Sequence, residues 1–167
     1  MIIEGLHQGK ATALGFASGI LAGLVAVTPA AGVVQPYGAM ILGVMASLVC
    51  YMAIMFKNKL GYDDSLDAFG IHGIGGITGA ILLSFFIRPA WWKEAEQISG
   101  GSWSVLNQMG IQALAVAIAV VYAAVMTWLL IAGLNRIIRI RSTEAEEMAG
   151  LDRSYHGERG YGMLNPS

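Results

Sequence analysis

The sequence has little charge. Only 13 % of its 167 residues are Asp, Glu, Lys or Arg, about half of the roughly 25 % that is usual for a soluble domain. The mean hydropathy is +0.61, and 56 % of the residues are hydrophobic. Long stretches carry no charge at all, whereas charged residues gather after residue 135. These features exclude an ordinary soluble domain and favour an integral membrane protein with a polar tail.

Other scarcities narrow the function. A net charge of −1 gives no sign of a nucleic-acid partner. The single cysteine, Cys50, cannot form a disulfide within the chain, and its apolar surroundings predict that it packs as a small hydrophobic residue. Because no Ser, His and Asp set, cysteine pair or cluster of metal ligands is present, we expect neither an enzyme, nor a cofactor, nor a metal site. Because Glu4 stands where a signal peptide has its basic region, we do not expect the N-terminus to be a signal peptide.

Four apolar stretches have the length of a membrane span, since about 20 helical residues cross the roughly 30 Å hydrocarbon core. We predict spans at about residues 11–34, 37–56, 67–87 and 110–135. Residues 1–141 would then form a transmembrane portion, and residues 142–167 a tail. We expect an all-α integral membrane fold, a polar loop between the third and fourth spans, and one short helix in the tail.

The basic residues predict the orientation of these spans. With four spans, the N-terminus, the loop after the second span and the tail lie on one side. Eight of the ten Lys and Arg residues lie on that side: Lys10, Lys57, Lys59, Arg136, Arg139, Arg141, Arg153 and Arg159. The other side has Arg88 and Lys93. Because Lys and Arg are enriched on the cytoplasmic side of membrane proteins, both termini are predicted to be cytoplasmic.

Small residues recur at helical spacing in the first and third predicted spans. These residues are Gly15, Gly19, Gly23, Gly75 and Gly79. In lipid, such ridges let helices approach closely, and we interpret the glycines as packing residues. Ser65 or Asp67 is expected to cap the third helix, because both side chains accept hydrogen bonds from free N–H groups at a helix start.

His72 lies well inside a predicted span, where no Asp, Glu, Lys or Arg is found at similar depth. It lies about 7.5 Å along the helix from Asp67, and ionisable groups at such depth usually face a bundle interior or a water-filled path. A structural histidine that joins two helices is an equally open interpretation. A metal or haem ligand is disfavoured, because His7 and His156 both lie outside the spans.

Three long segments resemble one known family. They are "GKATALGFASGILAGLVAVTPAAG", "GYDDSLDAFGIHGIGGITGA" and "GLDRSYHGERGY". All three are similar to segments of the ammonium transporter (Amt/Mep/Rh) family, in the bacterial and archaeal Amt style. The resemblance runs from about Gly9 to Tyr161 in the family's order. Ala11 departs from it, since the family usually has proline after "GK".

The resemblance implies a fold of eleven helices in two inverted halves of five plus a long last helix, assembled as trimers with a pore in each subunit. This chain resembles only the C-terminal part, helices eight to eleven and the tail. It implies a multi-pass protein of the cell (inner) membrane. The partners implied are ammonium or ammonia, the lipid bilayer, further copies of the transporter and a P-II-type nitrogen signalling protein.

The resemblance also assigns roles to residues. His72 matches the second of two pore histidines, which line the path of ammonia and can relay its proton. Asp67, Ala68, Ser18 and Thr28 match pore-lining or supporting positions, although helix–helix hydrogen bonding is equally open for the serine and the threonine. The tail residues that match a motif for coupling between subunits are Gly150, Asp152, His156, Gly157 and Glu158.

Two functions are therefore compared. In the first, the chain serves ammonium transport by supplying the pore histidine of the second half. In the second, it is a non-conducting truncated fragment, or a subunit that modulates full-length transporters. An enzyme that uses His72 is disfavoured, because nothing resembling a catalytic set accompanies the imidazole.

Overall fold

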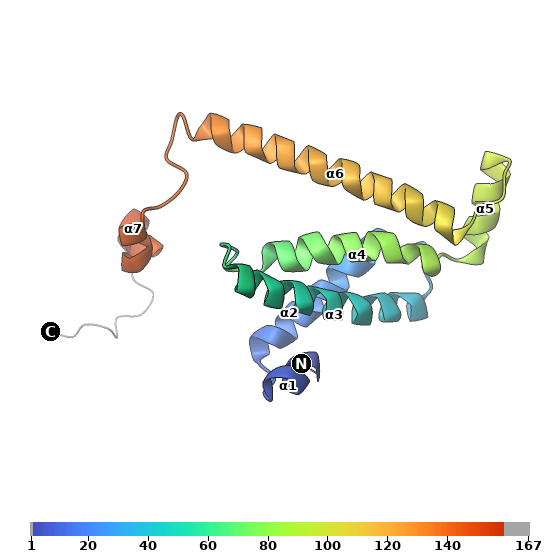
Figure 1. The fold of residues 1–167 in the computed structure, drawn as a ribbon, viewed down its shortest axis with the longest axis horizontal. Helices are drawn as coiled ribbons and strands as arrows, with labels where there is room; N and C mark the ends of the chain where they lie inside the picture. Colours follow the sequence, from blue (N-terminus) through green and yellow to red (C-terminus); the bar gives the residue numbers. More distant parts are fainter. Residues whose placement is uncertain (1, 159–167) are drawn as a thin grey trace. The chain divides into compact units, whose positions relative to one another are not determined.

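A computed structural model describes residues 2–158 of the chain (Figure 1). Arg159 and Tyr161, which belong to the orientation argument and to the tail motif, lie outside the described residues. Within residues 2–158 the structure is helical and has no β-strand; one isolated antiparallel bridge joins Val34 to Ile87. The all-α prediction is confirmed.

The chain divides within its longest helix into two units, residues 1–119 and 120–167. The first unit contains the elements α1 (Ile2–Gln8), α2 (Ala13–Val27), η1 (Thr28–Ala30), α3 (Pro36–Leu60), η2 (Phe69–Gly73), α4 (Ile74–Leu82), η3 (Leu83–Phe85) and α5 (Pro89–Ser99). Helix α6 (Val105–Leu134) begins in the first unit and ends in the second. The second unit also contains α7 (Glu144–Ala149) and η4 (Asp152–His156).

The helix boundaries have local causes. Thr12 begins α2 by accepting a hydrogen bond from the Gly15 N–H through its side chain (2.9 Å). Pro36 occupies the first turn of α3, where a missing N–H costs nothing, and Gly61 ends the helix in the left-handed conformation (φ 69°). The same pair of signals, Pro89 and Gly100, delimits α5. Residues 89–99 are therefore helical, and the prediction of a polar loop throughout this region is wrong.

Helices α2, α3 and α4 pack side by side in the first unit. One buried cluster consists of Ala30, Val34, Leu42 and Leu83. A second consists of Ala22, Cys50 and Ile71. Cys50 is 2 % exposed, as expected of a small packing residue. The core is thin, since few of the large apolar side chains are buried.

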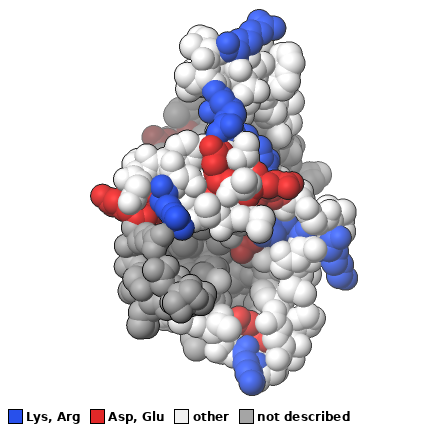
Figure 2. Space-filling view, turned by 90° about the vertical axis from the view of Figure 1, so that its left-hand side faces the viewer, with Lys and Arg blue, Asp and Glu red and all other residues white. Residues whose placement is uncertain are grey.

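Among residues 2–158, three helices are long and apolar enough to cross a membrane: Ala13–Ala30, Pro36–Leu60 and Val105–Leu134. The third predicted span corresponds to a shorter apolar helix, Phe69–Phe85. Only 17 % of the most apolar stretch of the first two helices is buried, and none of the third. Charged side chains are a minority on the face drawn in Figure 2. The chain therefore presents an extensive apolar surface, and exposing this surface to water would be energetically unfavourable.

Candidate functional site

The site is built at the end of the bundle where α3 ends and η2 begins. Gly61 ends α3, and a short loop leads to η2, which carries the histidine. Asp64 caps this second helix start, because its carboxylate accepts hydrogen bonds from the N–H groups of Ala68 (2.9 Å) and Phe69 (3.0 Å). The prediction that Ser65 or Asp67 is the capping residue is wrong.

Asp67 has a different task. Its backbone lies in the left-handed region (φ 54°), which Asp tolerates better than most residues. Its carboxylate forms an ion pair with the Lys57 ammonium, and the same ammonium donates to the main-chain oxygen of Asp64 (2.7 Å). The Lys57 side chain is 11 % exposed and that of Asp67 is 23 % exposed. Lys57, on the last turn of α3, thus joins that helix to the loop.

His72 lies in η2 on a face that α2 and α3 leave uncovered. Its neighbours Gly70, Ile71 and Gly75 are buried, whereas His72 itself is exposed. Nothing within residues 2–158 forms a hydrogen bond with its ring. An imidazole in an apolar helix needs partners for a donor and an acceptor. In this chain the ring is therefore available to a group from elsewhere.

Glycine also fixes how closely this helix packs against its neighbours. A β-carbon on Gly79 would collide with the main-chain carbonyl of Ala26 in α2, and one on Gly75 would lie 3.1 Å from the Cys50 sulfur in α3. The packing role predicted for these two glycines is confirmed. Gly19 differs, because open space surrounds the position of its missing side chain.

The remaining predicted pore residues are scattered. The Thr28 hydroxyl donates to the Leu24 carbonyl of its own helix (2.8 Å), and the side chain is exposed. Ala68 is exposed beside Asp67. Ser18 is half-buried and lines a cavity of about 190 Å³ that Asp67 also lines. Ser18 and Asp67 thus line the same cavity, and within the described residues neither Ser18 nor Thr28 forms a hydrogen bond with His72.

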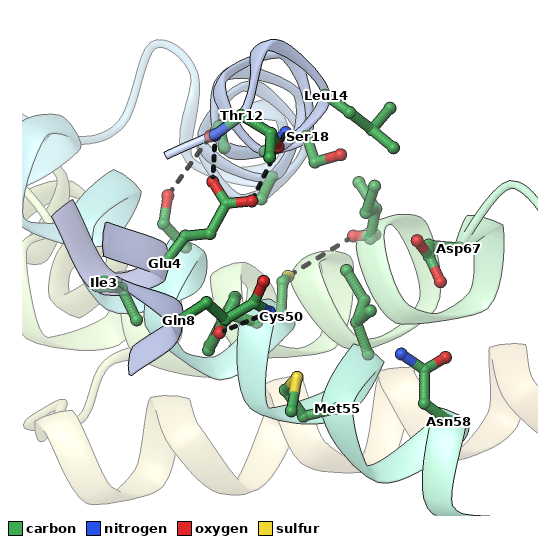
Figure 3. Close-up of a pocket in the computed structure, with 17 residues that line it drawn as sticks. Ile3, Glu4, Gln8, Thr12, Leu14, Ser18, Cys50, Met55, Asn58 and Asp67 are labelled. Atoms are coloured by element: carbon green, nitrogen blue, oxygen red, sulfur yellow. Dashed lines mark hydrogen bonds between the residues drawn. The ribbon is translucent and has the colours of Figure 1, made fainter. Parts of the chain in front are cut away.

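The cavity has a polar wall that the sequence analysis missed (Figure 3). Glu4 is only 8 % exposed, and its carboxylate accepts hydrogen bonds from the hydroxyl (2.7 Å) and the N–H (3.1 Å) of Thr12. Thr12 in turn caps α2. Glu4 therefore supports the start of α2. The only signal in the sequence is an acidic residue followed at some distance by a capping threonine, which is too common to be diagnostic.

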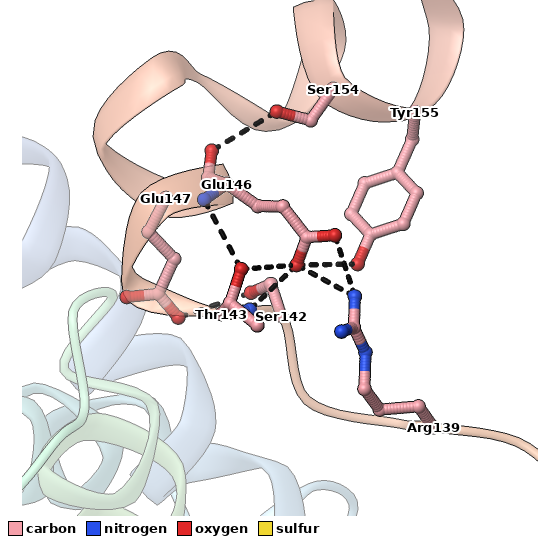
Figure 4. A network of polar contacts seen from close by, with 7 residues as sticks. All are labelled: Arg139, Ser142, Thr143, Glu146, Glu147, Ser154 and Tyr155. Atoms are coloured by element: carbon pink, nitrogen blue, oxygen red, sulfur yellow. Dashed lines mark hydrogen bonds and ion pairs between the residues drawn. The ribbon is translucent and has the colours of Figure 1, made fainter.

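The tail is organised by Glu146 (Figure 4). Its carboxylate accepts hydrogen bonds from the N–H (2.6 Å) and hydroxyl (2.8 Å) of Thr143, pairs with Arg139 (2.6 Å), and lies 3.5 Å from the Tyr155 hydroxyl. The Thr143 N–H, then its hydroxyl, then Arg139 lower the pKa of Glu146 to about 2. Of these residues, the sequence analysis named only Arg139, as one of the basic residues that predict the orientation.

The predicted tail residues lie in or beside η4, the segment that also carries Tyr155. Gly150 (φ 90°) follows α7, and Gly157 (φ 70°) ends η4, so both adopt backbone conformations that favour glycine. The Asp152 carbonyl accepts a hydrogen bond from the Glu158 N–H (3.2 Å), and His156 is exposed. Two short helical segments form here, where one helix was predicted, because a glycine interrupts them.

The long apolar helices, their unburied surfaces and the glycine-mediated packing define an all-α integral membrane protein. The pattern of the Ammonium Transporter Family matches residues 1–161. An ammonium transporter of Aquifex aeolicus is 42 % identical over 98 % of this chain and 38 % of its own length. One of Bacillus subtilis is 38 % identical over 96 % of this chain and 40 % of its own length.

Solved structures agree with the sequence relatives. A protein described as a sensor Amt protein is 29 % identical, with a TM-score of 0.79 over 92 % of this chain and 37 % of its own. Mep2 of Saccharomyces cerevisiae is 33 % identical, with a TM-score of 0.73 over 87 % of this chain and 34 % of its own. The chain belongs to the ammonium transporter family. It spans about two fifths of the length of the curated relatives it matches.

Proposed function

We propose that this chain serves the passage of ammonium or ammonia across a membrane, as the part of a transporter that supplies one pore histidine. Family membership supports the substrate. The observation that carries the proposal is the placement of His72, which is exposed on a helix that glycine contacts hold against α2 and α3. A second half of the transporter would cover that face and complete the pore.

The chemistry follows from the cost of moving charge through an apolar path. A bare ion loses hydration that such a path does not replace, whereas ammonium can leave its proton behind and cross as ammonia. An imidazole accepts a proton on one nitrogen and returns it from the other. His72 would relay the proton or hold the ammonia nitrogen by a hydrogen bond. Asp67 and Ala68 would support its helix start, and Ser18 and Thr28 would line or brace the lower path.

The unburied helices also support a particular arrangement in the membrane. We propose that the apolar helix Phe69–Phe85 crosses the bilayer together with α2–η1, α3 and α6, with both ends of the chain cytoplasmic in the cell membrane. In a homotrimer, the tail motif Gly150–Glu158 would contact a neighbouring subunit, and a P-II-type protein would dock on that side. Labelling of single cysteines placed in the tail and at Lys93 by an impermeant reagent tests the orientation.

The experiment that tests transport joins this chain to the segments of the Aquifex aeolicus relative that the match does not cover, and measures uptake of labelled methylammonium. His72→Ala removes one relay group worth about 1–1.5 kcal/mol in the path, so uptake is expected to fall roughly tenfold. His7→Ala, outside the spans, is the matched control and should transport normally. Unchanged uptake and selectivity in the His72 variant would remove the role proposed for the imidazole.

A second candidate is a chain that does not conduct by itself and modulates larger transporters. The fraction of the relatives that it spans and the uncovered face around His72 favour this candidate for the isolated chain. Liposomes that contain the 167-residue chain alone provide the test. No ammonium flux above protein-free liposomes is expected, and measurable flux would show that the chain forms a complete pore alone.

A further inference from the structure

The helical turn that carries His72 holds one residue more than an α-helical turn. The Ile74 N–H is directed at the carbonyl of Phe69, five residues earlier, so Phe69–Gly73 form a π-helical turn. An extra residue rotates the two sides of a helix by about 100° relative to each other, because an α-helix has 3.6 residues per turn. The direction of the His72 ring therefore depends on whether this turn persists or relaxes into a regular α-helix.

The helix beyond the turn cannot rotate freely. Gly79 lies against the Ala26 main chain, and Gly75 lies against the Cys50 sulfur. Rotating α4 would bring larger side chains against α2 and α3, where no space exists for them. The π turn must therefore be held or released from its other side, where the chain enters from α3.

Lys57 provides the attachment on that other side. Its ammonium binds two points of the entering loop, the Asp64 carbonyl and the Asp67 carboxylate, within a largely sheltered site. The Asp64 carboxylate holds the N–H groups of Ala68 and Phe69 at the start of the turn. The Asp67 carbonyl accepts a hydrogen bond from the Ile71 N–H (2.9 Å). One side chain of α3 thus fixes the segment from which the turn starts.

We propose that Lys57 is a positioning residue for His72. By clamping Asp64 and Asp67 to the end of α3, it preserves the π turn and with it the direction of the imidazole. The role in transport rests on the function proposed above for His72, whereas the structural effect on the turn can be measured without any transport. Lys57 touches no substrate in this scheme and acts only through the segment that it holds.

The first experiment measures amide hydrogen exchange of the 167-residue chain in detergent micelles. Lys57→Met keeps the length and apolar stem of the side chain but removes the ammonium, so exchange of residues 68–74 should accelerate roughly tenfold or more while the middle of α2 and α3 stays protected. Lys57→Arg should stay close to the parent chain, because it retains a cation. Lys59→Met is the matched control, since Lys59 is exposed two residues further along the same helix end.

Equal exchange in Lys57→Met and Lys59→Met would overturn the proposal. Asp67→Asn gives a second test that leaves Lys57 in place. It removes the paired charge but keeps a residue that tolerates a positive φ, and it should reproduce the faster exchange of residues 68–74. An unchanged pattern in this variant would also contradict the clamp.

The second experiment places the same variants in the joined transporter used for the uptake assay. Because His72 would act along the path and not at its entrance, Lys57→Met should lower the maximal uptake rate and leave the half-saturating concentration unchanged, and Lys57→Arg should restore the rate. If His72→Ala slows uptake and Lys57→Met does not, the positioning role is wrong although the transport function stands. If His72→Ala has no effect, the proposed function falls, and hydrogen exchange still decides whether Lys57 holds the turn.

Discussion

The α2–α4 bundle and the tail after Leu134 both stabilise a helix start with a capping side chain and an ion pair. The two regions differ in how exposed the ion pair is and in how closely the helices pack. In both regions a side chain caps the helix start, Asp64 for η2 and Thr143 for α7, and a basic residue earlier in the chain clamps an acidic partner. The Lys57 side chain is 11 % exposed, whereas that of Arg139 is 56 % exposed. The bundle adds close backbone packing, which the described tail lacks.

This difference teaches where the rigidity of the chain lies. A sheltered ion pair between packed helices is screened little by water, and removing one partner leaves an uncompensated charge. In an exposed ion pair, water and salt weaken the attraction between the two charges. The region of His72 is therefore expected to be stiff and intolerant of change, and the tail to be adjustable by solution conditions.

The largest expected effect concerns the glycine contact in the bundle. Gly79→Ala places a methyl group against the main chain of Ala26, which cannot move without moving α2, and should destabilise the chain by about 3 kcal/mol or more. Gly110→Ala, at a site in α6 with open space around it, should instead stabilise the helix by about 0.5–1 kcal/mol. Unfolding in detergent with increasing denaturant compares the two. Equal effects would contradict the contrast between packed and open helices.

A smaller effect is expected at the two caps. Asp64→Ala leaves two N–H groups of η2 without their acceptor and should cost about 1–2 kcal/mol, whereas Thr143→Ala should cost about 1 kcal/mol. Hydrogen exchange of residues 68–74 and 144–149 measures each loss locally. Asp64→Asn, which keeps a carbonyl acceptor, serves as the control and should recover most of the protection. A greater loss at the tail cap would reverse the proposed order of rigidity.

The smallest effect is the pH response of the tail. The pKa of Glu146 is lowered in the folded tail from 4.5 to about 2, so the unfolded tail binds more protons in this range. The stabilising contribution is therefore complete above about pH 4.5 and is lost as the pH falls towards 2. The nuclear magnetic resonance signal of the Tyr155 ring, assigned with Tyr155→Phe, should shift over this interval. Glu146→Gln should abolish this pH-dependent shift of the Tyr155 signal. If the variant shows the same titration, a group other than Glu146 causes the shift.

Sequence patterns predicted the helices better than they predicted the contacts that position them. Apolar runs indicated α2, α3 and α6 because length and hydropathy alone decide whether a helix suits a membrane. Helix α5 was missed because its Trp, Lys and Glu residues read as a polar loop, although Pro89 and Gly100 mark its two ends. The error in the tail has another origin, because Gly150 divides one predicted helix into two short segments.

The candidate site shows the same limit. Asp64, Ser65 and Asp67 lie within four positions, and all three are good capping residues, so composition could not choose among them. The choice depends on backbone angles, since Asp67 adopts a positive φ and its carboxylate turns to Lys57. The ion pair itself joins residues of different elements, which no local pattern records. His72 was predicted from its depth in an apolar segment and from the resemblance to a family, whereas only contacts between different elements point to Lys57.

The approach of α4 to α2 has a consequence for how such a chain can evolve. At Gly79 the obstacle is a peptide group of residue 26, which every amino acid shares, and not the methyl side chain of Ala26. Shortening the facing residue therefore cannot compensate for a bulkier one at position 79. A protein that loses this glycine in evolution must move α2 and α4 apart, and this movement would also displace the adjoining turn that carries His72.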